Sequence, residues 1–243
     1  MIAALETIGL AKQFGALQVA NDIHFRLAAG ARHALIGPNG AGKTTLVNLL
    51  TGRLAPSAGR ILLNGQDITR MSQAARARHG LTRTFQINNL FPALSVLENV
   101  RLAVTEHRGL FTARRRLLDE AFATLSRLGL QDDASTVLRR LPYGKQRLVE
   151  IAIALAAEPS VLLLDEPAAG VPQGESGIIF DVIEQLPVAM AVLMIEHDMD
   201  LVFRFAQSIT VMVRGAILVE GTPDEIAADP RVREVYLGSR THG

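Results

Sequence analysis

The sequence contains no cysteine among its 243 residues. This absence excludes disulfide bonds and thiol chemistry, and it fits a reducing compartment such as the cytoplasm. An excess of one charge is also lacking, because 25 Lys and Arg residues balance 24 Asp and Glu residues and leave a net charge of +1. The total charge therefore favours neither nucleic acid nor an anionic membrane as the main partner. Aromatic residues are scarce at 5%, whereas the mean hydropathy is positive at +0.23. This combination predicts aliphatic parallel strands that are buried on both faces.

Long hydrophobic runs are absent as well. The longest ones, Pro187–Ile195 and Ile151–Ala157, are about half as long as a bilayer-spanning helix requires. The start of the chain, Met1–Leu10, lacks the basic segment and apolar stretch of a signal peptide. We therefore expect a soluble or peripheral chain of one or two domains, large enough to bury a core without disulfide or metal staples.

What the sequence does contain is a phosphate-binding loop pattern, G-x-x-x-x-G-K-[ST], matched at every fixed position. Its glycines allow successive backbone N–H groups to point inward at the phosphates of a nucleoside triphosphate. Lys43 adds a positive charge, and Thr44 offers a hydroxyl to Mg²⁺. The run Ala31–Ile36 predicts a strand before the loop, and Thr44–Thr51 predicts a helix whose positive N-terminal end faces the phosphates. The alternative is a Gly-rich turn that matches by chance. The predicted loop consists of Gly37, Pro38, Asn39, Gly40, Ala41, Gly42, Lys43, Thr44 and Thr45.

Hydrophobic periodicity divides the rest of the chain. The pair Asn64-Gly65 between apolar runs predicts a hairpin, and together with short β-like runs in residues 2–36 it indicates an antiparallel sheet at an edge of the fold. Spacings of three and four predict an inserted helical subdomain, with helices at Val96–Val100, Leu117–Leu130 and Gln146–Ala157. Further strands are predicted at Val161–Leu164, Val192–Ile195, Ile209–Val213 and Ile217–Val219.

Two carboxylates, Asp165 and Glu166, follow the predicted strand Val161–Leu164. Asp165 is placed to hold Mg²⁺ through water. Glu166 would orient or deprotonate the attacking water, a role worth about 10²–10⁴-fold in rate. His197 follows another predicted strand and would donate a hydrogen bond to the γ-phosphate or to Glu166. The alternatives are solvated acids at a strand end and a structural histidine.

The phosphate loop, Thr84-Phe-Gln86, Leu141–Arg147, Asp165-Glu166 and His197 occur in the order and spacing of the ATP-binding cassette (ABC) family of transporter ATPases, which the chain resembles from about Ile2 to Gly238. Within that family it is similar to the ATPase subunits of branched-chain amino acid importers. The segments that carry this similarity are Arg83-Thr-Phe-Gln86, Leu90-Phe-Pro, Val96–Val100, Asp165–Gly170, Glu196–Met199 and Val235–Gly238. The lipopolysaccharide-export ATPase shares one of these features, the Tyr-Leu-Gly ending.

The resemblance implies an α/β fold: a P-loop NTPase core with an antiparallel β edge subdomain and an inserted helical subdomain. Residues 1–243 would form a single ABC ATPase domain. About 1–88 and 158–243 would make up the RecA-like core and the β subdomain, and about 89–157 the helical signature subdomain.

The family pattern also implies roles for single residues. Phe14 falls where an aromatic ring stacks on adenine, with Val19 nearby against the sugar or base, although a core phenylalanine is the alternative. Gln86 matches the glutamine that reaches the metal and the attacking water, and it begins the segment that senses the membrane partner. Mg²⁺ would thus be held by Thr44, Gln86 and Asp165, and ATP would be the nucleotide.

The family signature, usually Leu-Ser-Gly-Gly-Gln, holds the γ-phosphate of ATP bound on an opposing subunit. Here the five positions read Leu141, Pro142, Tyr143, Gly144 and Lys145. Tyr143 and Gly144 keep backbone N–H donors, and Lys145 adds a cation that would attract phosphate. Only Leu141 and Gly144 match the usual signature, however, and Pro142 replaces its serine hydroxyl, so the signature is weak. Because an unequal pair tolerates one weak signature, we expect a second ABC ATPase subunit that is non-identical to this chain, with a homodimer as the alternative.

The resemblance implies an inner-membrane importer for branched-chain or related amino acids, with permease subunits and, indirectly, a periplasmic solute-binding protein. The chain would lie in the cytoplasm, peripheral on the inner face of the membrane. No nucleic-acid partner is expected. Alternatives are a lipopolysaccharide-export ATPase, a soluble ABC ATPase acting on nucleic acid or ribosomes, and a weakly hydrolysing regulatory switch. The basic group Arg108, Arg114, Arg115 and Arg116 would face the permease or lipid, or more simply form a solvated helix face.

Overall fold

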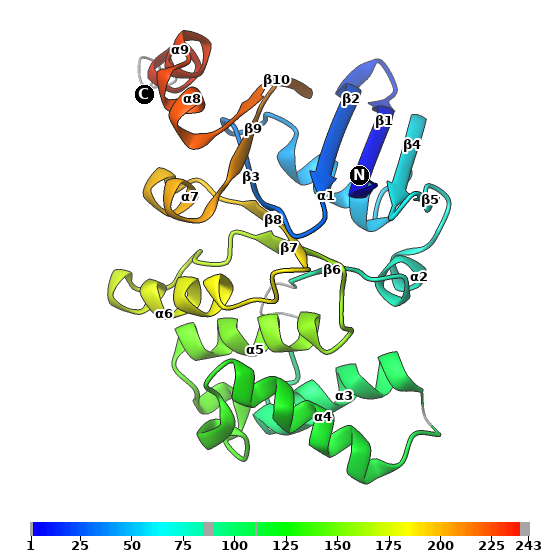
Figure 1. Ribbon diagram of the computed structural model, residues 1–243, viewed down its shortest axis with the longest axis vertical. Coiled ribbons are helices and arrows are strands. Elements are labelled where there is room, and N and C mark those ends of the chain that lie inside the picture. The colour runs from blue at the N-terminus through cyan, green and yellow to red at the C-terminus, as the bar shows by residue number, and fades with distance from the viewer. Residues whose placement is uncertain (1, 85–89, 110, 239–243) are drawn as a thin grey trace.

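The computed structural model describes residues 2–84, 90–109 and 111–238, without the side chains of residues 173–176 and 237–238. Its strands form two sheets, with helices over the larger sheet and beyond it at one end of the molecule (Figure 1). The alternation of strands with helices confirms the predicted α/β class.

The smaller sheet is antiparallel and has the order β2-β1-β4-β5. It consists of β1 (Ala3–Phe14), β2 (Leu17–Ala28), β4 (Ala58–Leu63) and β5 (Gln66–Asp67). The turn between β4 and β5 is the predicted Asn64-Gly65 pair, with φ values of 50° and 81°. Positive φ at both positions matches the twist of a two-residue hairpin, so this prediction is confirmed.

The larger sheet has the order β10-β9-β3-β8-β7-β6. Its strands are β3 (Arg32–Ile36), β6 (Leu81–Arg83), β7 (Val161–Asp165), β8 (Ala191–Ile195), β9 (Ser208–Val213) and β10 (Ala216–Gly221). All neighbours are parallel except β9 and β10, which pair antiparallel. In register, Leu35 of β3 lies beside Ile195 of β8, and Ile195 lies beside Asp165 of β7. The carboxyl ends of these three strands therefore meet at one edge of the sheet.

The central strands of this sheet are buried on both faces, as their aliphatic composition predicts. In β7, Val161 and Leu163 face the core between the two sheets, together with the helix α1 (Lys43–Thr51). Leu162 and Leu164 point to the opposite core, which is shared with the other helices. Alternate side chains of one strand thus join two cores.

Most of the remaining helices lie below the larger sheet or beside its edge strands, and those at the lower end of the molecule pack beneath another helix and not on the sheet (Figure 1). The predicted helices at 117–130 and 146–157 begin about one turn earlier than expected, at Arg114 and Tyr143. Among the described residues, none of the helices is both long and apolar enough to cross a bilayer. These helices are α2 (Gln73–Arg78), α3 (Val96–Arg108), α4 (Arg114–Arg127), α5 (Tyr143–Leu155), α6 (Gln173–Glu184), α7 (Met199–Phe205), α8 (Pro223–Ala228) and α9 (Pro230–Gly238).

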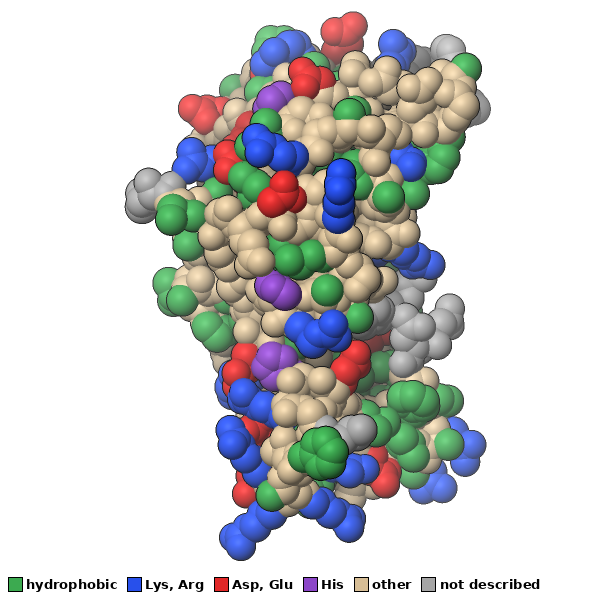
Figure 2. All heavy atoms as spheres, turned by 90° about the vertical axis from the view of Figure 1, so that its right-hand side faces the viewer, with side chains coloured by type: hydrophobic (Ala, Val, Ile, Leu, Met, Phe, Trp, Pro, Cys, Tyr) green, Lys and Arg blue, Asp and Glu red, His purple; other side chains and the backbone are tan. Residues whose placement is uncertain are grey.

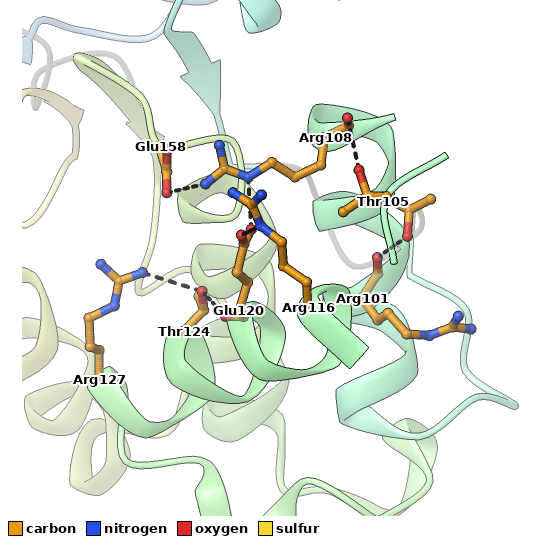
Figure 3. A network of polar contacts seen from close by, with 9 residues as sticks. Arg101, Thr105, Arg108, Arg116, Glu120, Thr124, Arg127 and Glu158 are labelled. Atoms are coloured by element: carbon orange, nitrogen blue, oxygen red, sulfur yellow. Dashed lines mark hydrogen bonds and ion pairs between the residues drawn. The ribbon is translucent and has the colours of Figure 1, made fainter. Parts of the chain in front are cut away.

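The basic group at the α3–α4 end of the molecule is partly neutralised. Glu120 of α4 accepts from Arg108 at 2.8 Å and from Arg116 at 2.9 Å, and Arg108 also reaches Glu158 at 2.7 Å (Figure 3). These ion pairs connect α3 and α4 to the segment that follows α5. In the space-filling view, Lys and Arg side chains with acidic ones among them gather at this end (Figure 2). The charges of Arg108 and Arg116 are thus paired with carboxylates of the same chain on a partly exposed surface, and the choice between a partner-facing and a solvated helix face stays a prediction.

Candidate functional site

The predicted phosphate loop lies between β3 and α1, which is the strand, loop and helix order that the sequence predicts. Gly42 caps α1 in a left-handed conformation (φ 101°), and no side chain caps this helix end. A Cβ on Gly37 (φ 152°) would lie 2.2 Å from the carbonyl oxygen of Met212, so only glycine fits there. The first N–H groups of α1, with the positive end of the helix dipole, therefore remain available for an anion.

Lys43 lies inside this loop and only 7% of its surface is exposed. Its ammonium group donates to the carbonyl oxygens of Gly37 at 2.6 Å and Pro38 at 3.2 Å. Burial lowers the pKa of Lys43, while the charges of Glu166 and Asp165 oppose that decrease. The fold thus brings the lysine of the loop and the two predicted carboxylates into one electrostatic neighbourhood, although they are far apart in sequence.

Asp165 is the last residue of β7, at the edge where β3, β8 and β7 end together. Its carboxylate forms an ion pair with Arg83, the last residue of β6, and the two side chains are 17% and 14% exposed. Arg83 also donates to Asn48 of α1 at 3.0 Å. One guanidinium therefore connects the predicted metal ligand to the helix that follows the phosphate loop.

Glu166 and His197 meet beside that carboxylate. The Nε2 atom of His197 lies 2.5 Å from Oε1 of Glu166, and both side chains are about half exposed. With Glu166 ionised, this geometry requires the proton on Nε2 of His197. The structure therefore brings together the predicted catalytic carboxylate and histidine in an open position, where a substrate can reach them.

The residues of the signature region stand at the start of α5, where Pro142 precedes Tyr143. A Cβ placed on Gly170, whose φ is 75°, would lie 3.1 Å from the Tyr143 hydroxyl. The ring of Tyr143 thus covers the loop that follows Glu166. Lys145 forms an ion pair with Asp133 at 2.7 Å. The positive charge expected to attract phosphate is therefore shared with a carboxylate, and its role toward phosphate stays a prediction.

Arg147 connects α5 to the loop that follows Glu166. Its guanidinium lies 5.4 Å from the Tyr143 ring centroid and donates to the carbonyl oxygen of Ala169 at 3.1 Å. It also pairs with the buried Glu150 at 2.8 Å. Burial raises the pKa of Glu150 to about 7, despite the opposing effect of Arg147. Direct contacts therefore join the first turns of α5 to the loop after Glu166.

The two residues predicted to touch the base and sugar lie on the β1–β2 hairpin. The backbone carbonyl of Val19 packs against the phosphate loop, since a Cβ on Gly42 would lie 3.0 Å from it. Phe14 lies at the end of β1 and is 52% exposed, with the ammonium of Lys12 4.9 Å from its ring centroid. An exposed ring is available for stacking on a base, and this role stays a prediction.

For a metal ion, the described residues supply the exposed Thr44 at the start of α1 and the carboxylate of Asp165. The third predicted ligand, Gln86, lies outside the described residues. Within the part of the chain that the structure describes, no group of three His, Asp or Glu side chains is arranged to hold a metal by itself. One carboxylate and one hydroxyl fit Mg²⁺ that is shared with substrate phosphates, which is how this ion usually binds.

Sequence reasoning missed several residues of this site. Arg83 lies within a quoted motif, but its contact with Asp165 depends on the pairing of β6 with β7. Tyr236 of α9 reaches the phosphate loop: burial raises the pKa of its phenol, and a hydrogen bond with the backbone of Gly37 opposes that increase. Glu196 follows β8 and is buried. In each case only the tertiary structure gives the partner.

Comparison with protein-family models shows two matches. Residues 20–169 match the ABC transporter family. Residues 216–242 match a second model, described as branched-chain amino acid ATP-binding cassette transporter. This second segment includes Tyr236, which contacts the phosphate loop.

Among curated proteins, the chain is 39% identical to the high-affinity branched-chain amino acid transport ATP-binding protein LivG of Escherichia coli (strain K12), over 96% of this chain and 97% of that protein. It is 38% identical to the corresponding protein BraF of Pseudomonas aeruginosa, with the same coverage.

Two solved structures are similar to the fold. A nucleotide-free ATP-binding cassette from an ABC transporter has a TM-score of 0.85 and 30% identity, over 96% of this chain and 98% of that one. An ATP-binding cassette in its ADP conformation has the same score and identity, over 98% and 100%. With the phosphate loop, the paired carboxylates and the histidine at one sheet edge, these matches show that the chain belongs to the ABC transporter family of ATP-binding proteins.

Proposed function

We propose that this chain is the ATP-hydrolysing subunit of an ABC importer for branched-chain or related amino acids. The observation that carries the hydrolytic part is the contact of His197 with Glu166 at 2.5 Å, beside the buried Lys43 of the phosphate loop. The names of LivG and BraF support the class of solute. In such a system the permease and a binding protein would select the solute.

The residues divide the work of ATP hydrolysis between binding and proton transfer. The N–H groups of the loop and the ammonium of Lys43 bind the phosphates of ATP, and Phe14 offers its exposed face to the base. Glu166 accepts the proton of the attacking water, and His197 orients Glu166 or donates to the γ-phosphate. Mg²⁺, held by Thr44, Asp165 and Gln86, would neutralise charge on the phosphates.

Tyr143 and Gly144 would act on the ATP of an opposing subunit through the N-terminus of α5. This chain lacks the serine hydroxyl of the usual signature, because Pro142 occupies that position, and Lys145 is paired with Asp133. We therefore infer that the partner is a non-identical ABC ATPase with a stronger signature. Binding of ATP would close the pair and hydrolysis would reopen it. Transport follows only if the permease binds these two states unequally.

The permease would dock on the face that bears α2 and α3. A cavity of about 340 Å³ lies between these helices, β6 and α5, lined among others by Arg83, Ala77 and His107. Arg83 also pairs with Asp165 and directly precedes Thr84-Phe-Gln86. A partner in this cavity would thus touch the residue that holds the predicted metal ligand. A permease bound there would hold the chain at the inner face of the cell membrane.

The proposal is tested by measuring ATP hydrolysis by this chain alone, mixed with its companion ATPase, and assembled with the permease in membrane vesicles. We expect low activity alone and a marked increase with the companion. Full activity of the chain alone would contradict the non-identical pairing. Tight ATP binding without hydrolysis in the complete assembly would contradict the transport function and favour a regulatory switch.

A further inference from the structure

Glu196 is a buried acid that the proposed chemistry does not use. It is the first residue after β8, and only 5% of its surface is exposed. Burying a carboxylate is costly unless hydrogen bonds or a counter-ion compensate for the lost water. Within the described part of the chain, its carboxylate forms no ion pair with Lys, Arg or His. Its compensation must therefore come from hydrogen bonds.

The two oxygens of this carboxylate bind two different segments. Oε2 accepts from the backbone N–H of His197 at 3.0 Å. Oε1 accepts from the backbone N–H of Ala168 at 3.3 Å. Ala168 lies two residues after Glu166, so one buried side chain joins the turn that carries Glu166 to the residue that meets it.

That turn is strained. Glu166 has a φ of 49°, in the left-handed region that residues other than glycine rarely adopt. Such a conformation persists only where several contacts hold it. Two backbone hydrogen bonds do so here, from the N–H of Glu166 to Ile195 at 2.9 Å and from the N–H of Ala169 to Glu166 at 3.0 Å. The bond from the N–H of Ala168 to the carboxylate of Glu196 is a further one, and its acceptor is a side chain.

The local charges agree with this arrangement. Burial raises the pKa of Glu196, and the backbone donors of His197, Ala168 and Asp198 oppose the increase, whereas the charge of Glu166 adds to it. The carboxylate is thus held by oriented N–H dipoles and stands next to a second carboxylate. An apolar side chain could fill the same space, but it would leave these N–H groups without an acceptor.

We propose that Glu196 is a positioning residue. Its carboxylate holds the backbone of the Glu166 turn and the backbone of His197 in fixed relative positions, so that the side chains of Glu166 and His197 meet. The inference rests on the proposed ATP hydrolysis, in which these two side chains act on the attacking water and the γ-phosphate. Glu196 acts through them and contacts neither reactant. Small misplacements of catalytic groups cost up to about a hundredfold in rate, which sets the size of the expected effect.

The test uses Glu196→Gln and Glu196→Ala in the chain assembled with its companion ATPase and permease. Glutamine keeps one acceptor oxygen but turns an NH₂ group toward the other N–H donor, so one of the two hydrogen bonds is lost. We expect kcat to fall about ten- to a hundredfold in Glu196→Gln, with KM and the Kd for ATP unchanged. The matched control is Glu220→Gln on β10, a carboxylate that accepts from the Thr210 hydroxyl at 3.0 Å. It should retain the wild-type kcat.

Combining substitutions at Glu196 and His197 distinguishes a positioning role of Glu196 from a general loss of structure. If Glu196 acts through His197, then Glu196→Gln should reduce kcat far less in a His197→Ala background than in the wild type. Amide hydrogen exchange at Ala168 and His197 should be faster in Glu196→Ala than in the wild type, with exchange in β7 and β8 unchanged. Because this readout requires no hydrolysis, it also applies if catalysis is abolished.

The outcomes are distinct. A wild-type assembly that binds ATP without hydrolysing it overturns the proposed function together with this role. An active wild type with an equally active Glu196→Gln variant, or with exchange at Ala168 and His197 unaltered in Glu196→Ala, overturns the positioning role alone. Equal losses in kcat with and without His197 also overturn it.

Discussion

The ring of Tyr143 covers Gly170 so closely that a Cβ at position 170 would lie 3.1 Å from its hydroxyl. The bulky residue in the signature turn is therefore accommodated by a glycine in the loop that follows Glu166. Arg147 holds the same two elements together through the carbonyl oxygen of Ala169. The effect on stability of a substitution at Tyr143 should therefore depend on the residue at position 170, and the reverse.

This relationship predicts a coupled pair. Gly170→Ala should lower the free energy of unfolding more in the wild type than in a Tyr143→Ala background, by about 1 kcal/mol, because the contact exists only when the ring is present. Urea unfolding of the four proteins measures the coupling. Gly129→Ala is the control, since Gly129 has a similar φ of 68° but no atom within 4 Å of an added Cβ. Its cost should be the same with and without Tyr143, and equal costs at Gly170 would disprove the coupling.

Replacing the proposed base should separate ATP binding from hydrolysis. Glu166→Gln keeps the size of the side chain but removes its basicity, so we expect turnover to fall at least about a hundredfold while ATP still binds. Binding of a fluorescent ATP analogue and steady-state phosphate release are the two measurements. Unchanged turnover would remove Glu166 as the base. Asp200→Asn, an exposed acid in the first turn of α7, serves as the control.

The helix that follows the phosphate loop depends on a buried arginine. Arg76 of α2 is 1% exposed and donates to the carbonyl oxygens of Leu49 and Leu50 at the end of α1, both at 2.6 Å. Arg76→Met should therefore lower the free energy of unfolding by about 3 kcal/mol, because these buried acceptors lose their partner. Thermal or urea unfolding measures the loss. The exposed Arg78 is the comparison: Arg78→Met should stay within about 0.5 kcal/mol of the wild type. Equal effects of the two substitutions would show that the buried contacts contribute little.

The buried Glu150 predicts a pH dependence of stability. Burial raises its pKa in the folded state to about 7 from an ordinary value of 4.5, so the folded chain holds this proton more tightly than the unfolded chain. The resulting stabilisation is complete below pH 4.5 and is lost as the pH rises through about 7. As the pH rises over this range, the free energy of unfolding of the wild type should therefore fall relative to that of Glu150→Gln. Urea unfolding at several pH values from 5 to 8 tests this, and a constant difference would contradict it.

The local motifs were predictable because their chemistry lies in consecutive residues. The glycines and Lys43 of the loop and the aliphatic run before Asp165 each depend on a few neighbours and on standard strand and helix periods. The Asn64-Gly65 hairpin was predictable for the same reason. Helix starts were less accurate. At α4 the sequence offers no side-chain cap that would mark the start, and α5 begins directly after Pro142.

The sequence by itself determined that the chain has a phosphate loop, two acids after a buried strand and a histidine after another. Tertiary structure decided which of these groups meet, because the order β3-β8-β7 sets the ends of three distant segments side by side. The contacts of Glu196 with Ala168, of Arg83 with Asp165 and of Tyr143 with Gly170 all join segments from different strands or helices. No local pattern encodes them, since a hydrogen bond or a packing contact depends on distance in space, which the pairing of strands and the packing of helices set.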